Sequence, residues 1–155
     1  MRGWIVVAAG VLALGLTAPV MAQGTSVGDV IAERRAGLRA TGAHLEAIQP
    51  VVQARGDTRA LVPRVDAMIA HFQAFPARFP PASLTPPMTQ GTQDGQTRAL
   101  AAIDANRANF NTANDNMIAA LVTLRGAAEA GTIPPDMLRA TGGTCGACHQ
   151  QFRAR

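Results

Sequence analysis

The sequence of 155 residues contains no lysine and no tyrosine, and it has only two cysteines and one tryptophan. All fourteen basic side chains are therefore arginines, and they are scattered along the chain rather than clustered. Aromatic residues make up only 4% of the chain. Because nucleic-acid-binding surfaces need a basic stripe or a row of stacking aromatic rings, this composition argues against a nucleic acid as partner.

The first 22 residues have the pattern of a secretory signal. Arg2 gives a positive start, residues 5–20 are mostly apolar, and Val20-Met21-Ala22 ends in a small residue suited to cleavage. A membrane anchor is the alternative, but the apolar run is short for a membrane span. We predict a signal peptide over residues 1–22, export to the periplasm, and one domain over the 133 remaining residues, 23–155.

Four segments repeat apolar residues with the period of an α-helix, and no segment alternates with the period of a strand. Pro50 is the expected end of the first helix, and Pro63 leaves the start of the second uncertain. Gly131 is the expected stop of the third helix, and Thr132 is the expected cap of the fourth. Residues 75–96 lie between the second and third helices and contain five prolines and two glycines, which predicts an irregular crossover.

Each predicted helix has one apolar stripe that it cannot bury alone. Packing the four stripes together gives an all-α fold, an antiparallel four-helix bundle with a long Pro-rich crossover between helices 2 and 3.

The last predicted helix contains C-x-x-C-H, formed by Cys145, Cys148 and His149, which is the attachment sequence for haem c. Two thiols one helical turn apart are spaced to add to the two vinyl groups of a haem, and the next imidazole is placed to bind the iron. Three other interpretations compete. A thioredoxin-like redox pair lacks its strand–helix context, a zinc site lacks a fourth ligand, and a plain disulfide does not require His149.

The segment from Gly142 to Arg153, GGTCGACHQQFR, resembles the C-terminal motif of the cytochromes c′, the class II c-type cytochromes. The resemblance implies one covalent haem c with its iron, and it makes a homodimer plausible. The sequence departs from the family at Ile103-Asp104, where an aromatic residue often follows the apolar haem contact.

The resemblance also implies roles for residues outside the motif. Leu38 is expected to cover the iron face opposite His149, and Arg153 is expected close to the proximal imidazole. Arg34 and Arg35 are candidate partners of the haem propionates, although solvated surface arginines are the alternative at both positions.

Leucine has no lone pair to donate, so Leu38 predicts a five-coordinate, high-spin iron with an open position. A six-coordinate, low-spin electron carrier is the alternative, with Met68, Met88 or Met117 as a possible source of sulfur. An open position without a distal hydrogen-bond donor is expected to favour nitric oxide or carbon monoxide over dioxygen.

The sequence thus predicts an electron-transfer and gas-binding haem protein without turnover of its own, whose redox partner is unknown. Two other functions stay open. One is a haem enzyme with peroxidase or nitric oxide reducing activity, and the other is a helical bundle in which C-x-x-C-H occurs by chance.

Overall fold

The structure is a computed structural model that describes residues 25–155. The predicted signal peptide, residues 1–22, lies outside the described residues. The helices are α1 (Val27–Gln53), α2 (Val62–Gln73), α3 (Ala102–Ala105), α4 (Arg107–Glu129) and α5 (Pro135–Phe152), with 3-10 turns η1 (Arg59–Leu61), η2 (Pro76–Arg78) and η3 (Pro81–Ser83). Within the described part of the chain, no helix is both long enough and apolar enough to cross a membrane.

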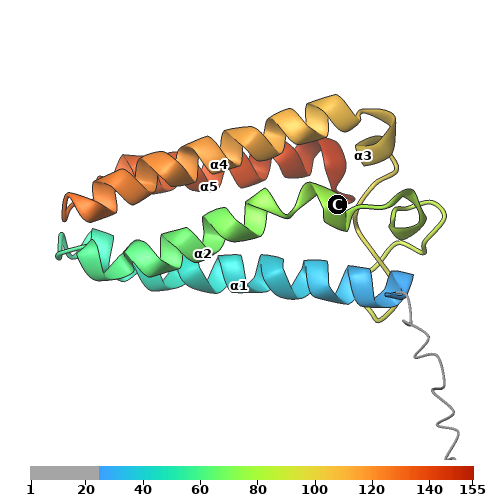
Figure 1. The fold of residues 1–155 in the computed structure, drawn as a ribbon, viewed down its shortest axis with the longest axis horizontal. Coiled ribbons are helices and arrows are strands. Elements are labelled where there is room, and N and C mark those ends of the chain that lie inside the picture. Colours follow the sequence, from blue (N-terminus) through green and yellow to red (C-terminus); the bar gives the residue numbers. More distant parts are fainter. Residues whose placement is uncertain (1–24) are drawn as a thin grey trace, which may run out of the picture.

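Four long helices, α1, α2, α4 and α5, lie along one another and alternate in direction (Figure 1). The described residues contain isolated β-bridges in and beside the crossover but no strand. The predicted all-α class, the antiparallel four-helix bundle and the long crossover between its second and third helices are therefore confirmed. Helix α4 packs closely on both α2 and α5, whereas α1 approaches α5 at only a few positions.

Helix α1 begins at a capping box and continues past Pro50. Ser26 accepts a hydrogen bond from the Asp29 amide, and the Asp29 carboxylate accepts one from Ser26. The expectation that Pro50 ends the helix is wrong, because a proline in the last turn removes only its own N–H donor. The helix ends instead at Gln53, three residues after Pro50 and just before Arg55, which has a left-handed φ of 54°. The amides of Arg55 and Gly56 then donate to Val52 and Val51, as in a Schellman motif.

The third predicted helix is divided in two and the fourth begins later than expected. Asn106 separates α3 from α4 with a non-helical backbone. Gly131 stops α4 as predicted, with a φ of 90°. The Thr132 amide donates to Ala127 and so closes α4. Thr132 does not cap α5, because the cap position of α5 is Pro134, two residues further on. Helix α5 starts at Pro135, a residue that suits a first turn because it lacks an N–H.

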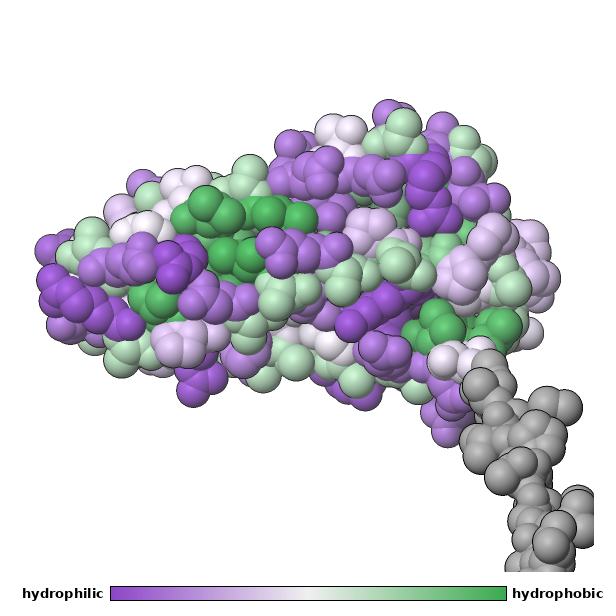
Figure 2. All heavy atoms as spheres, viewed as in Figure 1, coloured by the Kyte–Doolittle hydropathy of each residue, from purple (hydrophilic) through white to green (hydrophobic). Residues whose placement is uncertain are grey.

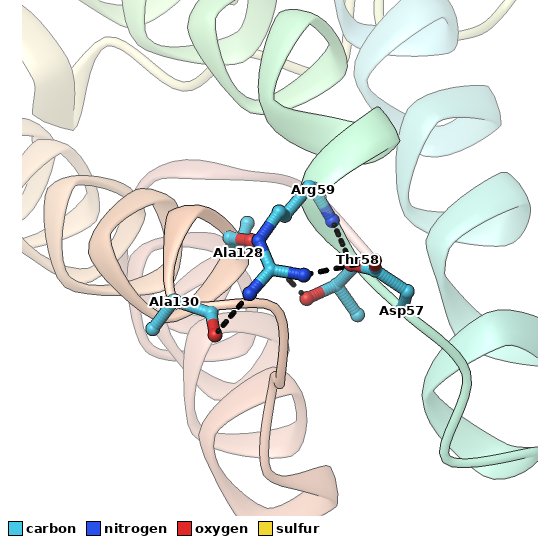
Figure 3. Close-up of polar contacts among 5 residues, drawn as sticks. All are labelled: Asp57, Thr58, Arg59, Ala128 and Ala130. Carbon is cyan, nitrogen blue, oxygen red and sulfur yellow. Dashed lines mark hydrogen bonds and ion pairs between the residues drawn. The ribbon is translucent and has the colours of Figure 1, made fainter.

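The turn between α1 and α2 is fastened to the turn between α4 and α5 (Figure 3). The Thr58 hydroxyl donates to the Ala128 carbonyl at 3.3 Å, and the Thr58 amide donates to Gly131 at 3.2 Å. Arg59 pairs with Asp57 at 2.9 Å and donates to the Ala130 carbonyl at 3.4 Å. A guanidinium at this position complements the negative end of the α4 dipole. These contacts close the end of the bundle opposite the crossover (Figure 1).

One hydrophobic cluster fills the bundle and includes the fully buried Ile48, Val65, Met68, Leu121 and Leu124. Figure 2 shows that apolar residues also gather on the surface over the packed α2 and α4. Val122 of α4 is 54% exposed, so the apolar stripe of α4 is wider than the core requires.

Candidate functional site

A cavity of about 480 Å³ lies where α1 and α5 are only loosely packed. Its volume falls within the range of roughly 300–1,000 Å³ that is usual for small-molecule and cofactor sites. Its walls come from α1, the end of α2, the crossover, α3, α4 and α5. They comprise Arg34, Arg35, Leu38, Arg39, Thr41, Gly42, Leu45, Phe72, Phe75, Phe79, Gly91, Thr92, Thr97, Arg98, Ala99, Ile103, Phe110, Ala113, Asn114, Met117, Thr144, Cys145, Cys148, His149, Phe152 and Arg153.

Helix α5 brings both thiols of the motif to this cavity. Cys145 and Cys148 are half-buried and are not joined to each other by a disulfide. Burial raises the pKa of both thiols, and the neighbouring Cys145 raises that of Cys148 further. Both sulfurs are therefore held as neutral thiols at neutral pH. An added Cβ at Gly142, Gly143 or Gly146 would meet no atom within 4 Å, so the space beside this turn is open.

His149 lies one residue beyond the second thiol and also lines the cavity. Its pKa is lowered by partial burial first, and then by the positive charges of Arg153 and Arg98. A lowered pKa keeps the imidazole neutral, which is the form that binds a metal ion. Residues 25–155 hold no cluster of three or more His, Cys, Asp and Glu side chains suited to a free metal ion.

Arg98 was not singled out from the sequence. It lies in the crossover, where no periodicity marks it, and it reaches the site because the crossover is tied to the C-terminus. The Arg98 side chain donates to the Ala154 carbonyl at 3.1 Å, and the Arg98 carbonyl accepts from the Ala154 amide at 2.8 Å. The Leu100 amide donates to Phe152 at 3.0 Å in the same way.

Helix α1 supplies the wall on which Leu38, Arg34 and Arg35 were predicted to lie. Leu38 is 36% exposed although it is a large apolar residue in the middle of a helix. Arg35 is half-buried and donates to the backbone carbonyls of Gln93 and Thr92 in the crossover. The structure therefore brings all three residues to the same cavity as the thiols and His149.

Arg34 is 2% exposed, so the alternative of a solvated surface arginine is wrong at this position. Its guanidinium donates to the Arg78 carbonyl at 3.0 Å, to the Ser83 hydroxyl and carbonyl at 3.0 and 3.2 Å, and to the Thr97 hydroxyl at 2.8 Å. It also lies 4.4 Å from the ring centroid of Phe79. Burial lowers its pKa to about 10. Arg34 thus fixes the crossover onto α1, and a propionate contact at this residue stays a prediction.

All five phenylalanines of the sequence line the cavity, which sequence reasoning missed. Their rings form a chain of contacts from Phe72 through Phe75, Phe79 and Phe110 to Phe152, with centroid distances of 4.7 to 5.4 Å. Phe110 and Ile103 form the α3–α4 wall, where the sequence departs from the family pattern. An aromatic wall of this kind suits a large flat apolar group.

Two polar features lie beside this wall. The Asn114 amide donates to the Phe72 carbonyl at 3.1 Å, but the Oδ1 atom of Asn114 is buried without a partner. Met117 lines the cavity with its sulfur 3.2 Å from the hydroxyl of Thr144, which belongs to α5. Met68 is fully buried in the core, and neither Met68 nor Met88 lines the cavity.

The chain matches the family model described as Cytochrome C' over residues 29–153. No curated protein matches it. It is similar to the crystal structure of cytochrome c′ from Rubrivivax gelatinosus, with a TM-score of 0.69 and 22% identity over 85% of this chain and 100% of that chain. A cytochrome c′ described as having an unusual ligand-controlled dimer dissociation gives a TM-score of 0.71 and 20% identity over 85% of this chain and 99% of that chain.

A ferrous variant of cytochrome c prime from Alcaligenes xylosoxidans with bound NO gives a TM-score of 0.67 and 23% identity over 86% of this chain and 99% of that chain. At sequence identities of 20% to 23%, the similarity to these solved structures establishes the fold alone. The match to the family model does not depend on this structural similarity. The matched range, residues 29–153, includes every residue that lines the cavity. The chain therefore belongs to the cytochrome c′ family.

Proposed function

We propose that this chain is a periplasmic mono-haem c-type cytochrome that transfers electrons and binds small gaseous ligands. The observation that carries the proposal is one cavity that joins Cys145, Cys148 and His149 to an aromatic wall. These residues fit haem c, since the thiols are half-buried at the cavity wall and the imidazole follows them directly. When bound, the haem supplies an iron that cycles between the ferrous and ferric states and takes up diatomic ligands.

The protein's own residues divide the work of holding this group. Cys145 and Cys148 would provide the two thiols for thioether bonds, and His149 would provide a nitrogen ligand for the iron. Partial burial, and then the charges of Arg153 and Arg98, lower the pKa of the imidazole and so favour its neutral form. The phenylalanine rings exclude water from the apolar part of the cavity.

Leucine has no donor atom, so in this proposal Leu38 would give the iron no ligand from α1. Of the three methionines considered as alternatives, Met117 lines the cavity. Its sulfur faces Thr144 on α5, the helix that carries His149, and Leu38 belongs to α1. This placement supports a five-coordinate, high-spin iron that is open to nitric oxide or carbon monoxide.

The lining residues also favour binding and electron transfer over catalysis. Peroxidase or nitric oxide reducing chemistry needs a group that moves protons beside the reacting ligand. No aspartate or glutamate lines the described cavity, and its one histidine is the proposed iron ligand. Export and a homodimer remain parts of the proposal. The dimer is supported by the relative named for ligand-controlled dimer dissociation.

The decisive experiment produces the full chain in a host that exports it and attaches haem. The purified protein should be coloured, have the mass of residues 23–155 plus one haem, and keep the haem in denaturant. Its reduced spectrum should be five-coordinate and should change on adding carbon monoxide or nitric oxide. A Cys145→Ser, Cys148→Ser double variant should lose the covalent group, while each single variant should retain one thioether bond.

A colourless protein with the mass of the bare polypeptide would overturn the proposal. A coloured protein that is six-coordinate and low-spin before any gas is added would instead favour the electron-carrier alternative.

A further inference from the structure

The charged residues that line the cavity all have the same sign. Five arginines line it, Arg34, Arg35, Arg39, Arg98 and Arg153, and none of the described lining residues is an aspartate or a glutamate. Arg34 is buried and fully engaged with the crossover. The other four, which we call the arginine rim, are half-buried or exposed. The charge of the rim is therefore at least partly exposed to solvent.

Six of the ten carboxylates pair with arginines outside the cavity lining. Ion pairs join Arg59, Arg78, Arg107, Arg125 and Arg139 to neighbouring acids, and none of these arginines lines the cavity. No described rim arginine has an ion pair. Asp29 and Asp94 line a neighbouring hollow together with Arg35 and Arg39. No described ion pair offsets the rim charge, although the whole chain carries a formal charge of only +4.

Bound haem does not cancel this charge. A haem carries two propionates, so even with both beside the rim, its four arginines leave an excess of two positive charges. A concentrated patch of one sign steers partners of the opposite sign, and it does so through its local field rather than through net charge.

We infer that the arginine rim is the docking surface for a redox partner protein with an acidic surface. The inference rests on the proposed function, because it concerns electron exchange at the same haem site. Arg35 and Arg98 are held in place by hydrogen bonds to the crossover and the C-terminus, so two of the four charges are preorganised. Arg39 has no hydrogen bond or ion pair to another described side chain and is free to reach a partner carboxylate.

The first test measures electron transfer from the reduced holoprotein to two small oxidants of opposite charge. One electron passes from ferrous iron to ferricyanide, giving ferric iron and ferrocyanide, and no proton is exchanged. The second oxidant is the cationic tris(phenanthroline)cobalt(III), which is reduced to cobalt(II). We expect the rate of oxidation by ferricyanide to fall about tenfold between low and high ionic strength. The rate of oxidation by the cobalt complex should rise.

Two charge-reversal variants distinguish the effect of the arginine rim from the effect of the protein's net charge. Arg39→Glu alters the rim, and Arg64→Glu is its matched control, because Arg64 is also exposed and makes no described ion pair but lies on α2 outside the cavity. Both variants change the net charge equally. Arg39→Glu should weaken the salt dependence with ferricyanide several-fold, whereas Arg64→Glu should leave it nearly unchanged. Equal effects of the two variants, or a ferricyanide rate that rises with salt, would overturn the inference.

The second test does not depend on electron transfer. The ferric holoprotein, labelled with ¹⁵N, is titrated with octaglutamate as an acidic probe and followed by NMR. Amide shifts should concentrate around Arg39, Arg98 and Arg153 and vanish at high salt. Shifts centred on Arg55 and Arg64 would contradict the inference. A colourless chain would refute the proposed function, whereas a coloured chain with no rim response would refute only the docking surface.

Discussion

The imidazole of His71 in α2 lies directly against Gly37 in α1, where a Cβ added to the glycine would be 2.2 Å from the ring carbon Cε1. The ring is held on its other sides by Phe72 and Phe75, whose centroids are each 5.2 Å from it, and by Arg78 at 3.2 Å from Nδ1. Phe72 and Phe75 line the cavity. The glycine that admits His71 immediately precedes Leu38, so this contact places the α1 wall of the cavity relative to its aromatic wall.

Gly37→Ala is expected to destabilise the protein by about 1–3 kcal/mol, because the added methyl group overlaps the His71 ring and forces α1 and α2 apart. Gly126→Ala is the matched control, since its added Cβ meets no atom within 4 Å and alanine is the better helix former. The free energy of unfolding from denaturant titration separates the two. Equal stability of Gly37→Ala and the parent would contradict the contact.

His71 should make stability depend on pH. Partial burial, and then the charge of Arg78, lower its pKa from the ordinary 6.5. Between the lowered value and 6.5 the unfolded chain binds the proton and the folded chain does not. The free energy of unfolding should therefore be highest above this window and fall as the pH drops through it.

The check is a series of denaturant midpoints from about pH 5 to about pH 8, the range in which histidine titrates. The stability of His71→Gln should fall less steeply with decreasing pH than that of the parent protein. His44→Gln should lose stability with decreasing pH as the parent does, because His71 remains. A parent protein that gains stability on acidification would refute the expectation.

Thr58→Val should weaken the closed end of the bundle by about 1–2 kcal/mol, because the Ala128 carbonyl loses its buried hydroxyl donor. Thr123→Val removes a similar hydroxyl bond, to the Ala119 carbonyl, on an exposed surface of α4. We expect that control to change the free energy of unfolding by less than about 0.5 kcal/mol. Indistinguishable effects of the two variants in denaturant titration would show that the Thr58 hydrogen bond does not stabilise this end of the bundle.

Arg34→Lys should cost about 2–4 kcal/mol of stability, because an ammonium group cannot reproduce the four hydrogen bonds of the planar guanidinium. The crossover should become sensitive to limited proteolysis in the same variant. Arg39→Lys keeps the charge at a position without such bonds and should behave like the parent. An Arg34→Lys protein with the stability and protease resistance of the parent would refute the anchoring role.

Leu38→Met should convert the reduced holoprotein to a six-coordinate, low-spin spectrum before any gas is added, because a thioether sulfur donates where leucine does not. Leu45→Met, on the same helix and the same cavity wall, is the control and should stay five-coordinate. A Leu38→Met spectrum identical to that of the parent would argue against placing Leu38 over the iron.

Sequence patterns predicted the features that depend on residues close together in the chain. The heptad spacing of Ile103, Phe110, Met117 and Leu124 marked one face of the third helix, and α4 buries three of them while Ile103 is buried in α3. Gly131 was recognised as a stop because a left-handed residue after a helix is a local requirement. The spacing of Cys145, Cys148 and His149 is likewise fixed by one turn of one helix.

Sequence patterns alone therefore established the four amphipathic helices, their order and the C-x-x-C-H group. The helical period places neighbours i+3 and i+4 on one face whatever the rest of the chain does. The burial of Arg34, the meeting of all five phenylalanines in one cavity wall, and the effect of Arg98 on the pKa of His149 became visible only in the folded chain. Those relationships join residues dozens of positions apart. They exist because packing of helices and crossover brings distant segments together, and no local period encodes that packing.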